Sequence, residues 1–180
     1  IFKSLNNGQT RKQVYNQGQV VSLVVSDGVM IGGGAKGLLR SGDQGENWES
    51  VSTEDGGYRK AGIIQGGFFA ISNGKPFVGD PQSRDNHMQI SMDGGKTWQH
   101  MDDQLAPLRS GYDSDKKRAS IQYINDAEQV GASLFCSLNA GIYRSDDQGK
   151  TWKLVLPAAA KMSYNLAISG KMIYAVIAGG

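Results

Sequence analysis

Several residue types are scarce in this chain of 180 residues, and each scarcity excludes a class of structure or function. The single cysteine, Cys136, rules out a disulfide within the chain, and its apolar neighbours indicate a buried strand. No apolar stretch approaches the ~20 residues that cross a bilayer, so we expect no transmembrane segment. The formal net charge is only +2, from 19 basic and 17 acidic residues, which predicts no nucleic-acid partner.

Metal-binding patterns are also missing. The two histidines, His87 and His100, belong to no recognisable motif, and His87 is interpreted as a solvent-facing loop residue. The segment from Asp113 to Asp115 resembles half of a calcium loop but has neither the glycine nor the terminal glutamate at the required spacing. We therefore expect no metal and no cofactor.

Glycine is abundant, at 25 residues against 4 prolines, and it separates short apolar runs. This pattern is typical of many short strands joined by tight turns. Strand, turn and strand are predicted over 20–26, 27–28 and 29–33, over 68–72, 73–74 and 76–79, and over 164–169, 170–171 and 172–178.

A longer pattern, Ser-x-Asp-x-Gly-x-x-Trp, occurs at residues 41–48, 91–98 and 145–152 and uses all three tryptophans. In a turn, the Asp carboxylate accepts backbone N–H bonds, the Gly adopts a positive φ, and the Trp opens the next strand and buries its ring. Every position thus has a structural role. The residues are Ser41, Asp43, Gly45 and Trp48, then Ser91, Asp93, Gly95 and Trp98, then Ser145, Asp147, Gly149 and Trp152.

A fourth, degenerate copy occupies residues 4–11, with Ser4, Asn6 in the Asp place and Gly8. The serines stand at positions 4, 41, 91 and 145, so the steps are 37, 50 and 54 residues. Propeller blades repeat at roughly this spacing, about 40–50 residues. The predicted fold is all-β: a single β-propeller domain over 1–180, built of four-stranded antiparallel blades.

The two ends of the chain are complementary. The last unit ends after two strands, and the first begins with a third strand and its turn, so together they can close one blade of a four-bladed ring. A ring closed in this way is a monomer. The alternatives are a piece of a larger propeller and a homo-oligomer.

The repeats resemble the Asp-box, or BNR, repeats of sialidases, sortilin-type receptors, xyloglucan-cleaving glycoside hydrolases and the photosystem II assembly-factor family. The segment 141–152 is most similar to the non-enzymatic assembly-factor type and its secreted relatives. This resemblance implies structural turns on the outer part of each blade at Asp43, Asp93, Asp147 and Asn6. It also implies an extracytoplasmic location, secreted or periplasmic.

The sequence gives little support for a catalytic function, and we predict no catalytic residue. A sialidase would require an arginine triad, but the expected Arg-Ile-Pro tripeptide is missing. A glycosidase requires two carboxylates about 5–10 Å apart, and no pair stands out among the loop acids. If the chain is an enzyme, a glycoside hydrolase is the expected class.

Two long connections, 80–87 and 102–118, are the expected ligand-binding loops, since long loops on a rigid scaffold often carry function. The binding candidates are Tyr58, Arg84, Arg109 and Tyr112. We expect a non-catalytic binding or assembly scaffold for a protein partner. The alternative is a carbohydrate-active protein, either a glycan-binding module or a glycosidase- or sialidase-related fragment.

Overall fold

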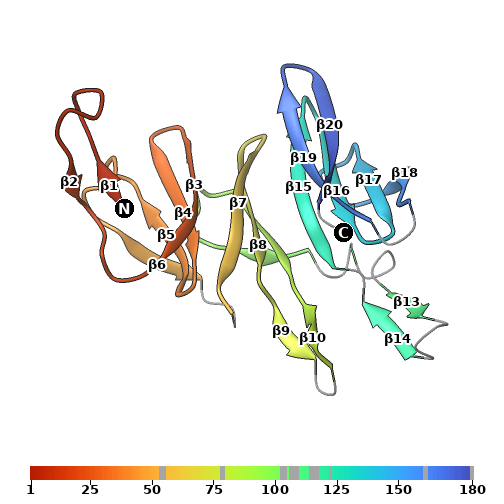
Figure 1. Ribbon diagram of the computed structural model, residues 1–180. Helices are drawn as coiled ribbons and strands as arrows, with labels where there is room; N and C mark the ends of the chain where they lie inside the picture. Colours follow the sequence, from red (N-terminus) through yellow and green to blue (C-terminus); the bar gives the residue numbers. More distant parts are fainter. Residues whose placement is uncertain are drawn as a thin grey trace. The chain divides into compact units, whose positions relative to one another are not determined.

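The computed structural model describes residues 1–52, 56–77, 80–101, 105, 110–113, 118–121, 123–159 and 162–178. Every element with described bounds is a β-strand (Figure 1). Within these residues the strands form three four-stranded sheets and four two-stranded sheets. The predicted all-β fold with four-stranded antiparallel blades is confirmed.

The first four-stranded sheet has the order β3-β4-β5-β6, so each strand pairs with the next along the chain. Its members are β3 (Val20–Ser26), β4 (Val29–Gly34), β5 (Gly37–Ser41) and β6 (Glu49–Ser52). The turn between β3 and β4 is made by Asp27 and Gly28 with φ of 49° and 77°, a left-handed pair that suits a two-residue hairpin. The strands predicted here are confirmed.

The second four-stranded sheet has the order β12-β11-β8-β7. Its members are β7 (Tyr58–Ile64), β8 (Gly67–Ser72), β11 (Met88–Ser91) and β12 (Gln99–His100). A separate hairpin of β9 (Lys75–Phe77) and β10 (Asp80–Asp85) is inserted between β8 and β11.

In this second sheet, the strands predicted as the first and second of the repeat are the second strand of the sheet and the first strand of the inserted hairpin. The segment 68–72 belongs to the second strand, β8, which pairs with β7 across a turn at Gln65 and Gly66. The segment after Gly74 forms β9, which pairs with β10 instead of with β8. The mixed run before Gln65 hides the first strand because it contains Arg59 and Lys60.

The third four-stranded sheet has the order β15-β16-β17-β18. Its members are β15 (Ile124–Val130), β16 (Ser133–Leu138), β17 (Gly141–Ser145) and β18 (Lys153–Pro157). Another hairpin, of β13 (Ser110–Asp113) and β14 (Arg118–Ile121), precedes this sheet along the chain.

The ends of the chain form two further hairpins. The first is made by β1 (Phe2–Lys3) and β2 (Lys12–Gln13), and the last by β19 (Ser163–Ser169) and β20 (Met172–Ala178). Each is a two-stranded sheet of its own among the described residues. The closure of one blade by both ends of the chain stays a prediction.

Polar side chains join the first strands of neighbouring sheets. The Ser22 hydroxyl accepts the N–H of Ala61 at 2.9 Å, which links β3 to β7. In the same way the Asp126 carboxylate accepts the N–H of Leu166 at 2.7 Å, which links β15 to β19. Both side chains lie at a register shift of their own strand, so the irregularity directs an oxygen toward the next sheet.

The chain divides into two compact units, residues 1–74 with 89–99, and residues 75–88 with 100–180. We call them unit 1 and unit 2. A core in unit 1 gathers Ile31, Leu38 and Tyr58 with residues of β7 and β8, and Trp98 packs against it. A core in unit 2 contains Ile142, Tyr164 and Leu166. A single domain over 1–180 stays a prediction.

Candidate binding end of the sheets

In the Ser-x-Asp-x-Gly turns, the serine hydroxyl forms hydrogen bonds to both the Asp carboxylate and the Gly backbone, and we call this pair of bonds the serine relay. In the second box, the Ser41 hydroxyl donates to the Asp43 carboxylate at 2.8 Å and accepts the N–H of Gly45 at 2.9 Å. The corresponding bonds measure 2.8 and 2.9 Å at Ser91, and 2.8 and 2.7 Å at Ser145. All three serines are buried, so each relay is shielded from water.

Each box carboxylate also holds the residue four positions ahead. Asp147 accepts the N–H of Thr151 at 2.8 Å and its hydroxyl at 2.6 Å. Asp93 does the same with Thr97, and Asp43 with the N–H and side-chain amide of Asn47. The box acids are therefore committed to their own turns, as the predicted structural role requires.

These hydrogen bonds favour the ionised carboxylates. The Thr151 hydroxyl, followed by its N–H, lowers the pKa of Asp147 to about 2. The N–H of Asn47, followed by its side chain, lowers the pKa of Asp43 to about 2, and the Thr97 hydroxyl lowers the pKa of Asp93 well below its usual range. A donor that binds only the charged form accounts for this direction.

Acid is therefore expected to destabilise the fold. Because the folded pKa values lie below the unfolded value of ~3.9, the stabilisation is complete above about pH 4 and is lost as pH falls toward 2. Melting temperatures between pH 5 and 2 measure this loss. Asp147→Asn is expected to flatten the dependence, and an unchanged slope in that variant would contradict the assignment.

The degenerate first box makes the same turn without a carboxylate. Gly8 donates its N–H to the Ser4 hydroxyl at 2.8 Å, and the Asn6 side-chain oxygen accepts the N–H of Thr10 at 2.8 Å and its hydroxyl at 3.2 Å. One amide oxygen thus replaces two carboxylate oxygens. In the tryptophan position, the Arg11 guanidinium lies over the Phe2 ring at 5.9 Å.

The box tryptophans are anchored through their indole N–H groups. Trp48, Trp98 and Trp152 donate to the carbonyl of the box glycine at 3.0, 3.1 and 3.0 Å. Their rings are only half-buried, so the expectation of buried rings was too strong. The strand also begins one residue later, as at Gln99 and Lys153.

The topology separates two ends of every four-stranded sheet. In an up-and-down order, the first and third connections lie at one end, and the second connection and the exit lie at the other. The box is always the third connection. In the sheet of β7, β8, β11 and β12, the two long connections are the second connection and the exit, so both leave at the end opposite its Asp-box. We call this the hairpin end.

Both long connections leave the sheet through residues of unit 2, and we call these residues the roots of the connections. The roots are well packed. Asn86, which is fully buried, donates to the carbonyl of Ile124 at 2.8 Å and accepts its N–H at 3.0 Å. The N–H of Met101 donates to the carbonyl of Met88 at 2.9 Å, and both residues are buried. The amide of Asn86 therefore pairs with β15 like a strand residue and fixes the end of the β9–β10 insertion.

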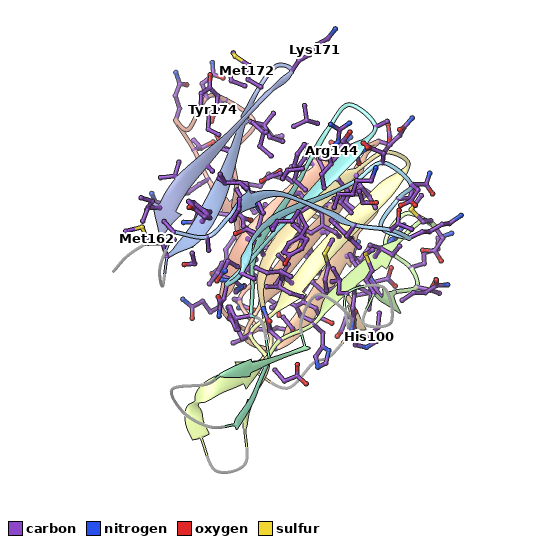
Figure 2. The ribbon with its side chains drawn as sticks, turned by 90° about the vertical axis from the view of Figure 1, so that its right-hand side faces the viewer. His100, Arg144, Met162, Lys171, Met172 and Tyr174 are labelled. Carbon is purple, nitrogen blue, oxygen red and sulfur yellow. The ribbon has the colours of Figure 1, made fainter. Side chains whose placement is uncertain are left out.

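The two histidines meet at the same roots. Their rings are 5.4 Å apart between centroids and nearly perpendicular, at 89°. His87 follows β10, and His100, labelled in Figure 2, ends β12. His87 is half-buried and His100 is exposed, so the interpretation of His87 as a loop residue facing solvent missed this contact. Nothing in the sequence signals it, because 13 positions and a complete Asp-box separate the two residues.

The four binding candidates do not form one cluster of described side chains. Tyr58 lies in β7 instead of a loop and is 0% exposed, and its hydroxyl donates to the Gln89 side chain at 2.9 Å. Arg84 lies in β10 opposite Pro76, and Tyr112 lies in β13 opposite Ala119. Arg109 is outside the described residues. Only Arg84 and Tyr112 are thus placed on the two hairpins.

One acid among the described side chains, Asp126, serves its own backbone surroundings. Asp126 is buried, and its carboxylate accepts the N–H groups of Ala127 and Leu166 at 2.9 and 2.7 Å, which is a structural role. In the same described set, no group of three or more His, Cys, Asp or Glu side chains is arranged to hold a metal ion. The carboxylates of the three Asp-boxes accept hydrogen bonds from their own turns, as described above.

Residues 143–154, from the end of β17 into β18, match the family model described as BNR/Asp-box repeat. This segment is a BNR/Asp-box repeat. The second and third boxes repeat its hydrogen bonds, and the first repeats them with Asn6 in place of the Asp. The predicted resemblance to Asp-box propellers is confirmed.

The chain is similar to several solved structures. An ancestral GH74 enzyme matches 98% of this chain and 24% of its own, with a TM-score of 0.64 and 20% identity. The computationally designed Ika4 protein matches 92% of this chain and 94% of its own, with a TM-score of 0.52 and 8% identity. At these identities the likeness establishes the fold alone, which is that of a β-propeller.

A third solved structure, YCF48 bound to D1 peptide, matches 98% of this chain and 68% of its own. Its TM-score is 0.43 at 12% identity, and a likeness of that size does not establish a common fold. The chain spans about a quarter of the GH74 enzyme that it matches.

The curated proteins contain no match to the chain. Within the described residues, no helix has the length and apolar character of a membrane span.

Proposed function

We propose that the chain is a non-catalytic binding or assembly scaffold that takes up a protein partner at its hairpin end. The observation that carries this proposal is the placement of both long connections at one end of one sheet, with the hairpins β9–β10 and β13–β14. Insertions of this length on a rigid β-sheet scaffold are more often functional than the short turns around them.

The anchoring of the insertions supports a binding role. The Asn86 amide pairs with both backbone groups of Ile124, and Met88, Met101 and Leu105 of the same unit are buried. A packed base of this kind reduces the entropy that a partner must overcome on binding.

The hairpins offer the chemistry of a protein interface. Each is a two-stranded sheet in the described part of the chain, and the outer edges of such a sheet are open to a strand of a partner. Arg84 on β10 and Tyr112 on β13 are of the residue types that dominate binding energy in protein interfaces. An extended segment of a protein partner is the ligand that fits these features best.

A non-catalytic role is supported by the use of the acids. The three box carboxylates and Asp126 each accept bonds from their own backbone surroundings, so these groups are not available as a general acid or base. The location outside the cytosol that the Asp-box resemblance implies is part of the proposal.

Carbohydrate binding is the second candidate. It is favoured by the likeness to a GH74 enzyme, whose fold matches nearly the whole chain. In this case the hairpin end binds a glycan in place of a peptide strand, with aromatic residues against the sugar faces.

The test compares the intact chain with a variant in which residues 110–121 are replaced by a short Gly-Ser linker. Both are used as bait in an extract of the source cells, and bound proteins are identified by mass spectrometry. We expect a partner that the intact chain retains and the variant loses. Arg84→Ala and Tyr112→Ala are each expected to weaken its binding roughly tenfold or more.

The matched control is Gly131→Asn, in the first turn of its sheet and thus at the Asp-box end. This variant is expected to keep the partner. A partner that the hairpin variant retains equally well would place binding elsewhere and overturn the proposal. Saturable binding to one class on a glycan array, lost in the same hairpin variant, would favour the second candidate.

A further inference from the structure

The two histidines of the chain lie side by side in unit 2, although a complete Asp-box separates them in the sequence. His87 stands between β10 and β11, and His100 is the last residue of β12. Their rings are 5.4 Å apart between centroids, and the ring planes meet at 89°. The sequence contains 2 histidines, so a site of this chain that uses more than one imidazole must use this pair.

The pairing of β11 with β12 brings both imidazoles to one face of the sheet. The two strands are neighbours, and the N–H of Met101 donates to the carbonyl of Met88 at 2.9 Å. Each histidine directly precedes one of these methionines. Because side chains alternate between the two faces of a strand, His87 and His100 share the face opposite the buried methionines. They are diagonal cross-strand neighbours, and at that spacing two ring side chains reach each other.

The backbone beside each histidine is anchored, and an ion can still reach the pair. Asn86, which directly precedes His87, binds both backbone groups of Ile124, and Met101, which directly follows His100, is buried. His87 is half-buried and His100 is exposed to solvent (Figure 2). Two ligands that are already held near each other lose less freedom when an ion binds.

The separation of the two rings fits a shared metal ion. A zinc ion lies ~2.0–2.1 Å from a ligating imidazole nitrogen, and this places it about 3.2 Å from the centre of the ring. Two imidazoles that bind one ion at angles of about 90–120° therefore have ring centres about 4.5–5.5 Å apart. The observed 5.4 Å falls within this range. The perpendicular ring planes fit as well, because each ring can turn about its own metal–nitrogen bond.

We propose that His87 and His100 bind a divalent transition-metal ion of the kind that favours imidazole nitrogen, such as Zn²⁺ or Cu²⁺. His87 ends the connection 80–87, and His100 lies where β12 leads into the connection 102–118, so the ion joins the roots of both long connections. Among the described side chains no third His, Cys, Asp or Glu joins the pair, so the two imidazoles are the ligands that the proposal names. The sequence predicts no metal here because two histidines so far apart form no ligand motif.

Isothermal titration calorimetry of the chain with zinc chloride tests this proposal. The chain carries no histidine tag, since a tag would bind the ion itself. We expect a saturable zinc site. His87→Ala and His100→Ala are each expected to weaken zinc binding by at least roughly 10- to 100-fold, because losing a ligand costs no less than losing a group that orients one.

Gln99→Ala is the matched control, since Gln99 is the exposed residue before His100 on β12 and carries no imidazole. It is expected to bind zinc like the intact chain. Circular dichroism checks that the variants are folded, and His100→Ala, which changes an exposed side chain, keeps the test decisive if His87→Ala does not fold. A folded intact chain without a saturable zinc site overturns the proposal, and so does a zinc site that a folded histidine variant retains unweakened or that Gln99→Ala loses.

Cu²⁺ gives a second readout that reports the ligands directly. Imidazole sites bind Cu²⁺ more tightly than Zn²⁺, and its unpaired electron couples to the nitrogens that hold it. With one copper ion per chain, the electron paramagnetic resonance spectrum of the intact chain is expected to show two imidazole nitrogens, and that of His100→Ala only one. A spectrum that His100→Ala leaves unchanged would place the copper elsewhere and contradict the proposal.

Discussion

Replacing Asn86 by alanine is expected to lower the free energy of unfolding by about 2–6 kcal/mol, because two buried backbone groups lose their partners at ~1–3 kcal/mol each. These groups are the N–H and the carbonyl of Ile124, which the Asn86 amide binds at 3.0 and 2.8 Å. Both residues are fully buried, so water cannot replace the lost bonds without opening the structure. Urea unfolding followed by circular dichroism measures the loss.

Two companion variants separate this explanation from a simple loss of volume. Asn86→Asp keeps an acceptor for the N–H of Ile124 but turns an oxygen toward its carbonyl, so it is expected to be at least as destabilising as alanine. Asn165→Ala, at an exposed position of β19, is expected to change stability by less than about 0.5 kcal/mol. A stable Asn86→Asp variant would contradict the assigned bonds.

The Asp-box turns could be predicted because their interactions are local. Ser41, Asp43 and Gly45 bond to one another within four positions, so the spacing of the motif carries the geometry itself. The hairpin at Asp27 and Gly28 is predictable for the same reason, since a left-handed pair of residues marks the turn.

The base of the hairpin end could not be predicted because its interactions are distant. Asn86 and Ile124 are 38 positions apart, and Asp126 and Leu166 are 40 positions apart. A lone Asn or Asp beside a short strand is also what an ordinary turn contains, so neither residue stands out. Tyr58 was misplaced in a loop because it follows Gly56 and Gly57, while its hydroxyl partner Gln89 is 31 positions away.

Three strands of the two insertions, β10, β13 and β14, were missed for a different reason. β10 contains a proline and two aspartates, and β13 begins with Ser and Gly, so neither has the apolar alternation that indicates a strand. Each of the three pairs with the neighbouring strand of its own hairpin. Sequence patterns therefore locate the scaffold well and the proposed binding elements poorly.

The contact between neighbouring blades is tested by the same substitution at two box glycines. Gly95→Ala is expected to lower the free energy of unfolding by about 2–5 kcal/mol, from a left-handed alanine at ~1–2 and overpacking at ~1–3 kcal/mol. The φ of Gly95 is 79°, and an added methyl group would collide with Ile31, which is completely buried. Because Ile31 is enclosed by the unit 1 core, it has no free space into which to move.

Gly8→Ala is the matched variant, since Gly8 has a φ of 84° and no described neighbour within 4 Å of an added methyl group. It is expected to lose only the backbone term, about 1–2 kcal/mol. Both glycines belong to unit 1 and to the same box position, so the difference between the two variants isolates the packing of one blade against the next. Urea unfolding followed by circular dichroism measures this difference. Equal losses for the two variants would mean that Ile31 does not hold the third box.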